Sequence, residues 1–150
     1  MKNKNRIIDV CAFFLVLLFV YTATSKLFGF NLFRYQLNLY PWIRKIAGPV
    51  AWGLPAAELG IAILLISLKG RLIGFYASLG LLILFTLYLI VMLSSRQHLP
   101  CSCGGVIQQL TWRQHVIFNL CCVGIAALGT LYQRKLSQHQ YTQTNFNHLK

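Results

Sequence analysis

Two cysteines separated by a single residue are the first candidates for chemistry in this sequence. Cys101 and Cys103 lie in the segment PCSCGG, where Pro100 precedes them and Gly104 and Gly105 follow. Because proline and paired glycines interrupt helices, the two thiols are predicted to lie on a turn. A disulfide between residues i and i+2 closes a small, strained ring, and strained disulfides are the labile ones. Thiol–disulfide exchange is therefore the first interpretation of this pair.

Two other interpretations of Cys101 and Cys103 stay open. The thiolates could join His98 and His115 in a Cys2His2 metal site, or hold copper(I) by themselves. The spacing of these four residues matches no standard zinc pattern. The cysteines could also be small residues in a tight loop that have no chemical role. The sequence is compatible with all three roles.

An acidic residue inside an apolar segment is the second candidate. Glu58 follows Pro55 by a few residues in such a segment. An ionised carboxylate is costly to bury in a membrane, so Glu58 is expected to be protonated or paired with a cation. Lys26, near the end of the preceding apolar segment, is the partner expected from depth. Glu58 is either a proton donor or acceptor beside the thiol loop, or a polar clamp between helices.

The third candidate is a polar stripe on the last apolar segment. His115, Asn119 and Cys122 follow at i, i+4 and i+7, which places them on one face of a helix. This face is expected to point into a helix bundle, where it could serve only for interhelical hydrogen bonds. His115 is also the nearest residue able to take a proton at neutral pH from a thiol in the loop. Cys11, Cys121 and Cys122 are expected to pack in the core as small hydrophobes.

The composition identifies the elements that must position these residues. Hydrophobic residues make up 57% of the 150 residues and charged residues only 11%, and Asp9 and Glu58 are the only acids. The apolar content excludes a disordered chain. A soluble domain normally carries about 25% charged residues, so the composition argues against a soluble globule. The formal net charge is +12, but the basic residues are scattered at the ends of apolar segments. This placement indicates contact with lipid headgroups and no nucleic-acid partner.

Four segments are apolar over the roughly 20 residues that a membrane-spanning helix needs. They cover about residues 7–28, 48–68, 72–93 and 112–132. Residues 69–71 are too few for anything but a tight antiparallel hairpin between the second and third helices. Residues 29–47 mix aromatic and basic side chains, as segments at the membrane interface do. Thr111 and Gln114 have the spacing of a capping box, which predicts that the fourth helix starts there. The tail after Tyr132 is polar and expected to be mobile.

The distribution of basic residues predicts the orientation. If the N-terminus is cytoplasmic, eight of the 14 basic residues lie on the cytoplasmic side: Lys2, Lys4, Arg6, Lys69, Arg71, Arg134, Lys135 and Lys150. The other six lie outside: Lys26, Arg34, Arg44, Lys45, Arg96 and Arg113. The positive-inside rule then places both termini in the cytoplasm and residues 94–111 outside. The first apolar segment is long and has no clean cleavage site after it, which favours a membrane helix over a signal peptide.

Over about residues 6–133 the chain resembles the MauE-like membrane proteins, within the wider DoxX-like four-helix set. The motifs that carry the resemblance are YTATSKL at residues 21–27, Phe33 with Leu37, LPAAEL at residues 54–59, and PCSCGG followed by LTWRQH and FN. The resemblance implies a four-helix bacterial inner-membrane protein tied to redox maturation of periplasmic proteins. In methylamine-utilising bacteria the family is associated with a thioredoxin-like partner and with production of a disulfide-rich dehydrogenase subunit.

These observations predict an all-α, integral membrane four-helix bundle over residues 6–133, with an extracytoplasmic Cys-x-Cys loop before the fourth helix and a polar cytoplasmic tail at 134–150. The leading functional hypothesis is a thiol–disulfide relay that serves a periplasmic thioredoxin-like partner. Either Cys101 or Cys103 would attack as the thiolate and the other would resolve the mixed disulfide. His115 would be the base, and Glu58 a proton carrier. The sequence carries no quinone, haem or flavin signature and identifies no cofactor. The alternative is a non-enzymatic accessory or export-assisting subunit with structural or metal-binding cysteines.

Overall fold

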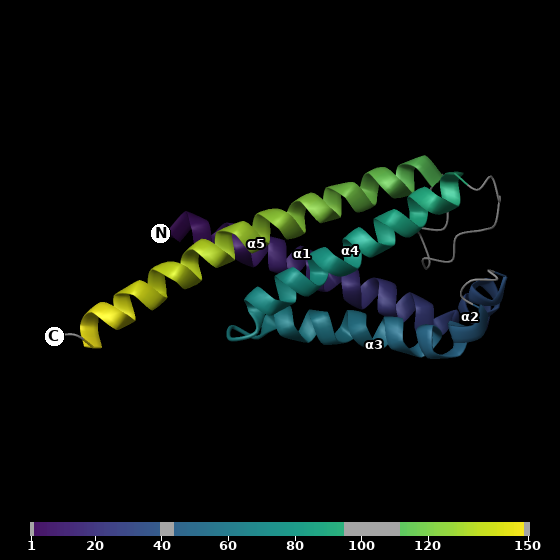
Figure 1. Cartoon of the computed structure of the whole chain (residues 1–150), viewed down its shortest axis with the longest axis horizontal. Helices are drawn as coiled ribbons and strands as arrows, with labels where there is room; N and C mark the ends of the chain where they lie inside the picture. The colour runs from purple at the N-terminus through teal and green to yellow at the C-terminus, as the bar shows by residue number, and fades with distance from the viewer. Residues whose placement is uncertain (1, 40–43, 95–111, 149–150) are drawn as a thin grey trace.

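The computed structural model describes residues 2–39, 44–94 and 112–148, which are all helices and short turns. The elements, labelled in Figure 1, are α1 (Lys2–Phe28), α2 (Phe30–Asn38), the 3-10 turn η1 (Arg44–Ile46), α3 (Ala47–Ile66), α4 (Arg71–Ser94) and α5 (Trp112–His148). The described ranges contain no strand. The all-α prediction is confirmed.

Four of these helices are long and apolar enough to cross a membrane. The candidate spans are Asn5–Phe28, Arg44–Ile66, Arg71–Val91 and Arg113–Gln138, in agreement with the four predicted segments. Large apolar side chains cover the outer surface of the bundle, among them Val10, Ile63 and Leu84, each about two-thirds exposed. In water such a surface would be unfavourable, whereas lipid tails solvate it. The chain is a multi-pass membrane protein.

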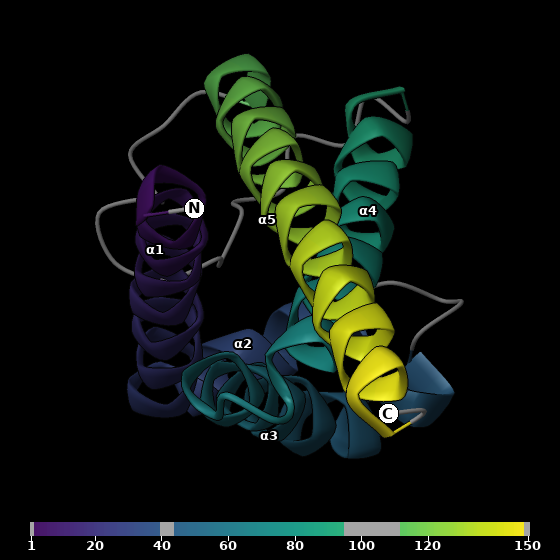
Figure 2. The ribbon, with the colours of Figure 1, turned by 90° about the vertical axis from the view of Figure 1, so that its left-hand side faces the viewer.

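The four long helices form a ring around a shared interior. α1 packs against α3 and α5, and α4 packs against the same two helices. Figure 2, which looks along the bundle, shows α1 and α4 on opposite sides. Each helix contributes fully buried apolar side chains to one core cluster, for example Leu15, Leu65, Phe75 and Ala126. Polar side chains placed at the centre of this ring are therefore separated from lipid by all four helices.

The turn between α3 and α4 is the predicted tight hairpin. α3 ends at Ile66 and α4 begins at Arg71. Arg71 donates to the carbonyl of Leu65 (Nε–O 3.3 Å) and to Asp9 of α1 (Nη1–Oδ1 2.7 Å). One of the two acids of the chain thus connects the N-terminal part of α1 to this turn.

Two segments differ from the sequence expectation. Within residues 29–47, α2 forms a short amphipathic helix whose Phe33 and Leu37 pack against Ala47 and Ala51 of α3. The fourth spanning helix is predicted to end near Tyr132, but α5 continues to His148. The prediction of its end was wrong because it relied on the loss of apolar residues, and polarity alone does not end a helix. No Gly or Pro, which would do so, follows Gly129.

Candidate functional site

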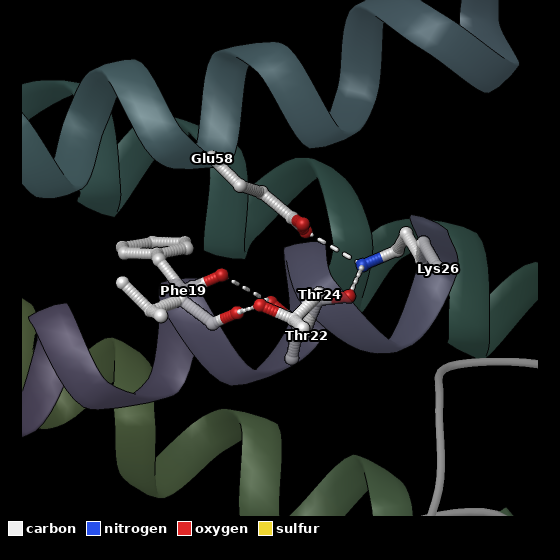
Figure 3. A network of polar contacts seen from close by, with 6 residues as sticks. Phe19, Thr22, Thr24, Lys26 and Glu58 are labelled. Carbon is white, nitrogen blue, oxygen red and sulfur yellow. Dashed lines mark hydrogen bonds and ion pairs between the residues drawn. The ribbon is translucent and has the colours of Figure 1, made fainter. Parts of the chain in front are cut away.

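A buried ion pair connects α1 to α3. Lys26 Nζ lies 2.7 Å from Glu58 Oε1, and only 3% and 8% of the two side chains are exposed. Figure 3 shows the two side chains reaching toward each other from facing helices. The prediction that Glu58 pairs with Lys26 is confirmed.

The geometry of antiparallel helices explains why these two residues meet. Side chains on a helix lean toward its N-terminus, so on α1 and α3 they lean in opposite directions along the bundle. Lys26 lies near the end of α1 and reaches back by one turn, where its Nζ also lies 3.4 Å from the carbonyl oxygen of Thr22. Glu58 lies in the middle of α3 and leans toward the beginning of that helix. The two charges therefore meet at an intermediate depth in the bundle.

The second oxygen of Glu58 is not satisfied by this pair. Oε2 is buried and has no hydrogen-bond partner within residues 2–39, 44–94 and 112–148. The nearby hydroxyl of Thr22 donates to the carbonyl of Phe19 (3.2 Å). A buried carboxylate oxygen without a donor is unfavourable, so this atom is expected to bind a group that the described residues do not supply.

The polar stripe on α5 faces the bundle interior, as predicted. His115, Asn119 and Cys122 are each 5% exposed or less. Asn119 Nδ2 donates to Thr86 Oγ1 (2.8 Å) and to the carbonyl of Leu82 (3.3 Å), and so connects α5 to α4. Asn119 thus makes the interhelical hydrogen bonds expected of such a stripe.

Thr86 is a member of this cluster that sequence reasoning missed. Its hydroxyl donates to Leu82 (2.7 Å) and accepts from Asn119. The available signal was a single threonine in the very apolar stretch LLILFTLYLIV of α4. Threonine is common in such helices because its hydroxyl bonds the preceding turn, so this signal is weak.

A cavity of about 50 Å³ brings the pair and the stripe together. Its lining comes from all four long helices. Apolar side chains form most of the wall, and the polar part consists of Thr22, Lys26, Glu58, His115 and Asn119. The rings of His115 and Phe85 also lie next to each other, with centroids 6.4 Å apart. Glu58 and His115, two predicted site residues far apart in the sequence, thus face one internal space.

The predicted thiol loop lies outside the described residues. This holds for Cys101, Cys103 and His98. The loop begins after α4 and ends where α5 starts at Trp112, so His115 occupies the first turn of the helix that follows it. Among the residues that the structure describes, no group of three or more His, Cys, Asp or Glu side chains could hold a metal ion.

The other three cysteines have different environments. Cys11 and Cys122 are buried in the apolar core, as expected. Cys121 is exposed on the outer face of α5, so the prediction of core packing was wrong for it. Successive residues on a helix point about 100° apart, so the two neighbours do not share one face.

Comparison with known families gives one match. The family described as methylamine utilisation protein MauE matches residues 4–132, which include all four spans except the last residues of α5. Neither the curated proteins nor the solved structures that were compared with the chain gave a match.

Proposed function

Because the chain belongs to the MauE family of methylamine utilisation proteins, we propose that it is a membrane thiol–disulfide relay for a periplasmic thioredoxin-like partner. We place it in the bacterial inner membrane, with both termini in the cytoplasm and the Cys101–Cys103 loop outside. In the exchange, one thiolate attacks a partner disulfide and forms a mixed disulfide. The second thiol then resolves it, so the relay becomes oxidised as the partner becomes reduced, or the reverse.

The observation that carries this proposal is the buried acid, base and cation below the start of α5. Thiol exchange requires a thiolate, so a proton must leave the attacking cysteine. His115 is in the first turn after the cysteine loop and is the base assigned to this step. Glu58 shares its cavity and is assigned to carry the proton further, while Lys26 holds the carboxylate in place.

The two cysteines have different assigned roles. Cys103 is the attacking thiol, because Gly104 and Gly105 leave its sulfur less hindered than that of Cys101 behind Pro100. Removing the resolving cysteine should therefore leave the mixed disulfide with the partner in place.

The experiment is to express Cys101→Ser and Cys103→Ser and search for a covalent, reductant-sensitive adduct with a thioredoxin-like protein. Cys101→Ser should accumulate this adduct, and the double variant should show none. Cys121→Ser is the matched control, because Cys121 is exposed on the outer surface of α5 and has no role in the exchange. The relay is excluded if neither single variant forms an adduct. Stoichiometric zinc or copper in the purified protein would then support the metal-binding alternative, and a metal-free, unreactive pair would support a non-enzymatic accessory or export-assisting subunit.

Glu58→Gln distinguishes a proton carrier from a polar clamp. Glutamine keeps the shape and can still accept a hydrogen bond from Lys26, but it cannot carry a proton. If Glu58 carries protons, the amount of protein in the membrane should be unchanged in this variant while the rate of disulfide exchange falls. If exchange is unchanged, Glu58 is only a clamp. Loss of the protein itself would indicate that assembly requires the charge pair.

A further inference from the structure

The cavity between the four helices contains Glu58 and His115, which are assigned to proton transfer above, and one of its polar atoms has no partner among the described residues. Glu58 is more than nine-tenths buried, and its Oε2 atom has no donor within the described ranges. Lys26 is bound to the other oxygen, and Thr22 Oγ1 donates to a backbone carbonyl. Within the described residues, no group donates a hydrogen bond to this atom.

The size of the cavity identifies the class of group that fits. Its volume is about 50 Å³. One water requires about 10–15 Å³ in this measure and two to four polar partners, whereas a cavity that binds benzene measures about 150 Å³. The cavity is too small for an aromatic ligand but has room for about three water molecules. Glu58, His115 and Asn119 provide polar partners on two sides of it.

We propose that this cavity is a hydrated proton site, in which bound water joins Glu58 Oε2 to the imidazole of His115. Its physiological purpose rests on the relay proposed above, but the binding of water and protons does not. The titratable groups that line the cavity within the described residues are Lys26 on α1, Glu58 on α3 and His115 on α5, and α4 contributes none.

The proton balance of this site is simple. His115 takes the proton of the attacking thiol and releases a proton through the water to Glu58 Oε2. The net change is one thiol and one carboxylate converted into one thiolate and one carboxylic acid, with no net charge moved out of the protein. The positive charge of Lys26 remains, so after the transfer it is no longer balanced by Glu58. This imbalance favours return of the proton once the thiolate has reacted.

The test uses purified protein in lipid nanodiscs, in a Cys101→Ser/Cys103→Ser background. This background removes thiol exchange, so failure of the relay cannot affect the result. Infrared difference spectra over a pH titration should show a carboxylic-acid band that is absent in Glu58→Gln. After mixing with D₂O, the rate at which this band shifts reports the access of water to Glu58. Replacing His115 by Gln should move the pH midpoint of the band, because coupled groups titrate together.

Filling the cavity provides the sharpest variant. Leu82 is buried on α4 and lines the cavity, so Leu82→Phe should displace the water and slow the D₂O shift by about tenfold or more. Leu84→Phe is the matched control, because Leu84 lies on the same helix but faces outward, and it should leave the rate unchanged. Leu54→Phe fills the same cavity from α3 and replaces Leu82→Phe if that variant does not fold. An unchanged rate in the folded filling variant, an unchanged midpoint in His115→Gln, or no Glu58 band would each overturn the proposal.

Discussion

Removing the positive charge of Lys26 should destabilise the bundle strongly. Lys26→Met keeps the length of the side chain but removes the charged partner that lies 2.7 Å from the Glu58 carboxylate. Breaking a buried ion pair from one side costs about 3–5 kcal/mol, because the remaining charge stays buried and unpaired. Folded proteins have a total free energy of unfolding of about 5–15 kcal/mol, so the predicted loss is a large fraction of it.

A double-mutant cycle with Glu58→Gln tests whether this cost comes from the buried, unpaired charge of Glu58. Glu58→Gln likewise leaves a buried unpaired charge, that of Lys26, but the glutamine oxygen and the Thr22 carbonyl can still accept hydrogen bonds from it, so the cost should be at the lower end of the same range, about 3 kcal/mol. In Lys26→Met/Glu58→Gln neither side chain of the pair is charged, and an apolar–amide contact replaces the pair. The double variant should therefore be more stable than Lys26→Met by about 1–3 kcal/mol.

The measurement is equilibrium unfolding in mixed detergent micelles, followed by loss of helical circular dichroism for the wild type and the three variants. A coupling free energy is then obtained from the four unfolding free energies. The reasoning is refuted if Lys26→Met costs less than about 1 kcal/mol, or if the double variant is no more stable than Lys26→Met.

Two further predictions concern orientation and packing. Cys101 and Cys103 should react with a membrane-impermeant thiol reagent added from the periplasmic side, since the basic residues place their loop there; labelling only after the inner membrane is opened would invert the topology. Gly129→Ala should destabilise the protein by about 1–3 kcal/mol, because a Cβ at this position would overlap the fully buried ring of Phe75. Gly124→Ala on the same helix is the control, because a Cβ there meets nothing within 4 Å, and it should be neutral or slightly stabilising. Unfolding in detergent measures both variants. Equal effects of the two substitutions would contradict the packing of α4 on α5.

The sequence was sufficient to predict the ion pair because depth in a membrane is a one-dimensional property. Because each residue adds 1.5 Å along a helix, the depths of Lys26 and Glu58 in the membrane can be counted from the ends of their helices. An unpaired charge at that depth is costly, so a nearby opposite charge is the expected partner. The helical period, which also depends on local sequence alone, placed His115, Asn119 and Cys122 on one inward face. Hydropathy failed to predict the end of α5, because it falls after Tyr132 while the helix continues to His148.

What the sequence by itself determined is which segments enter the membrane and which of their residues face inward, since hydropathy and helical period depend on local order alone. Only the tertiary structure decided which inward faces meet. The ring order, with α1 and α4 on opposite sides, depends on close contacts such as that of Gly129 with Phe75. That order puts Glu58 and His115 on one cavity, pairs Asn119 with Thr86, and leaves Glu58 Oε2 without a donor in the described ranges. These contacts depend on how side chains from different helices fit together, which no pattern within one helix specifies.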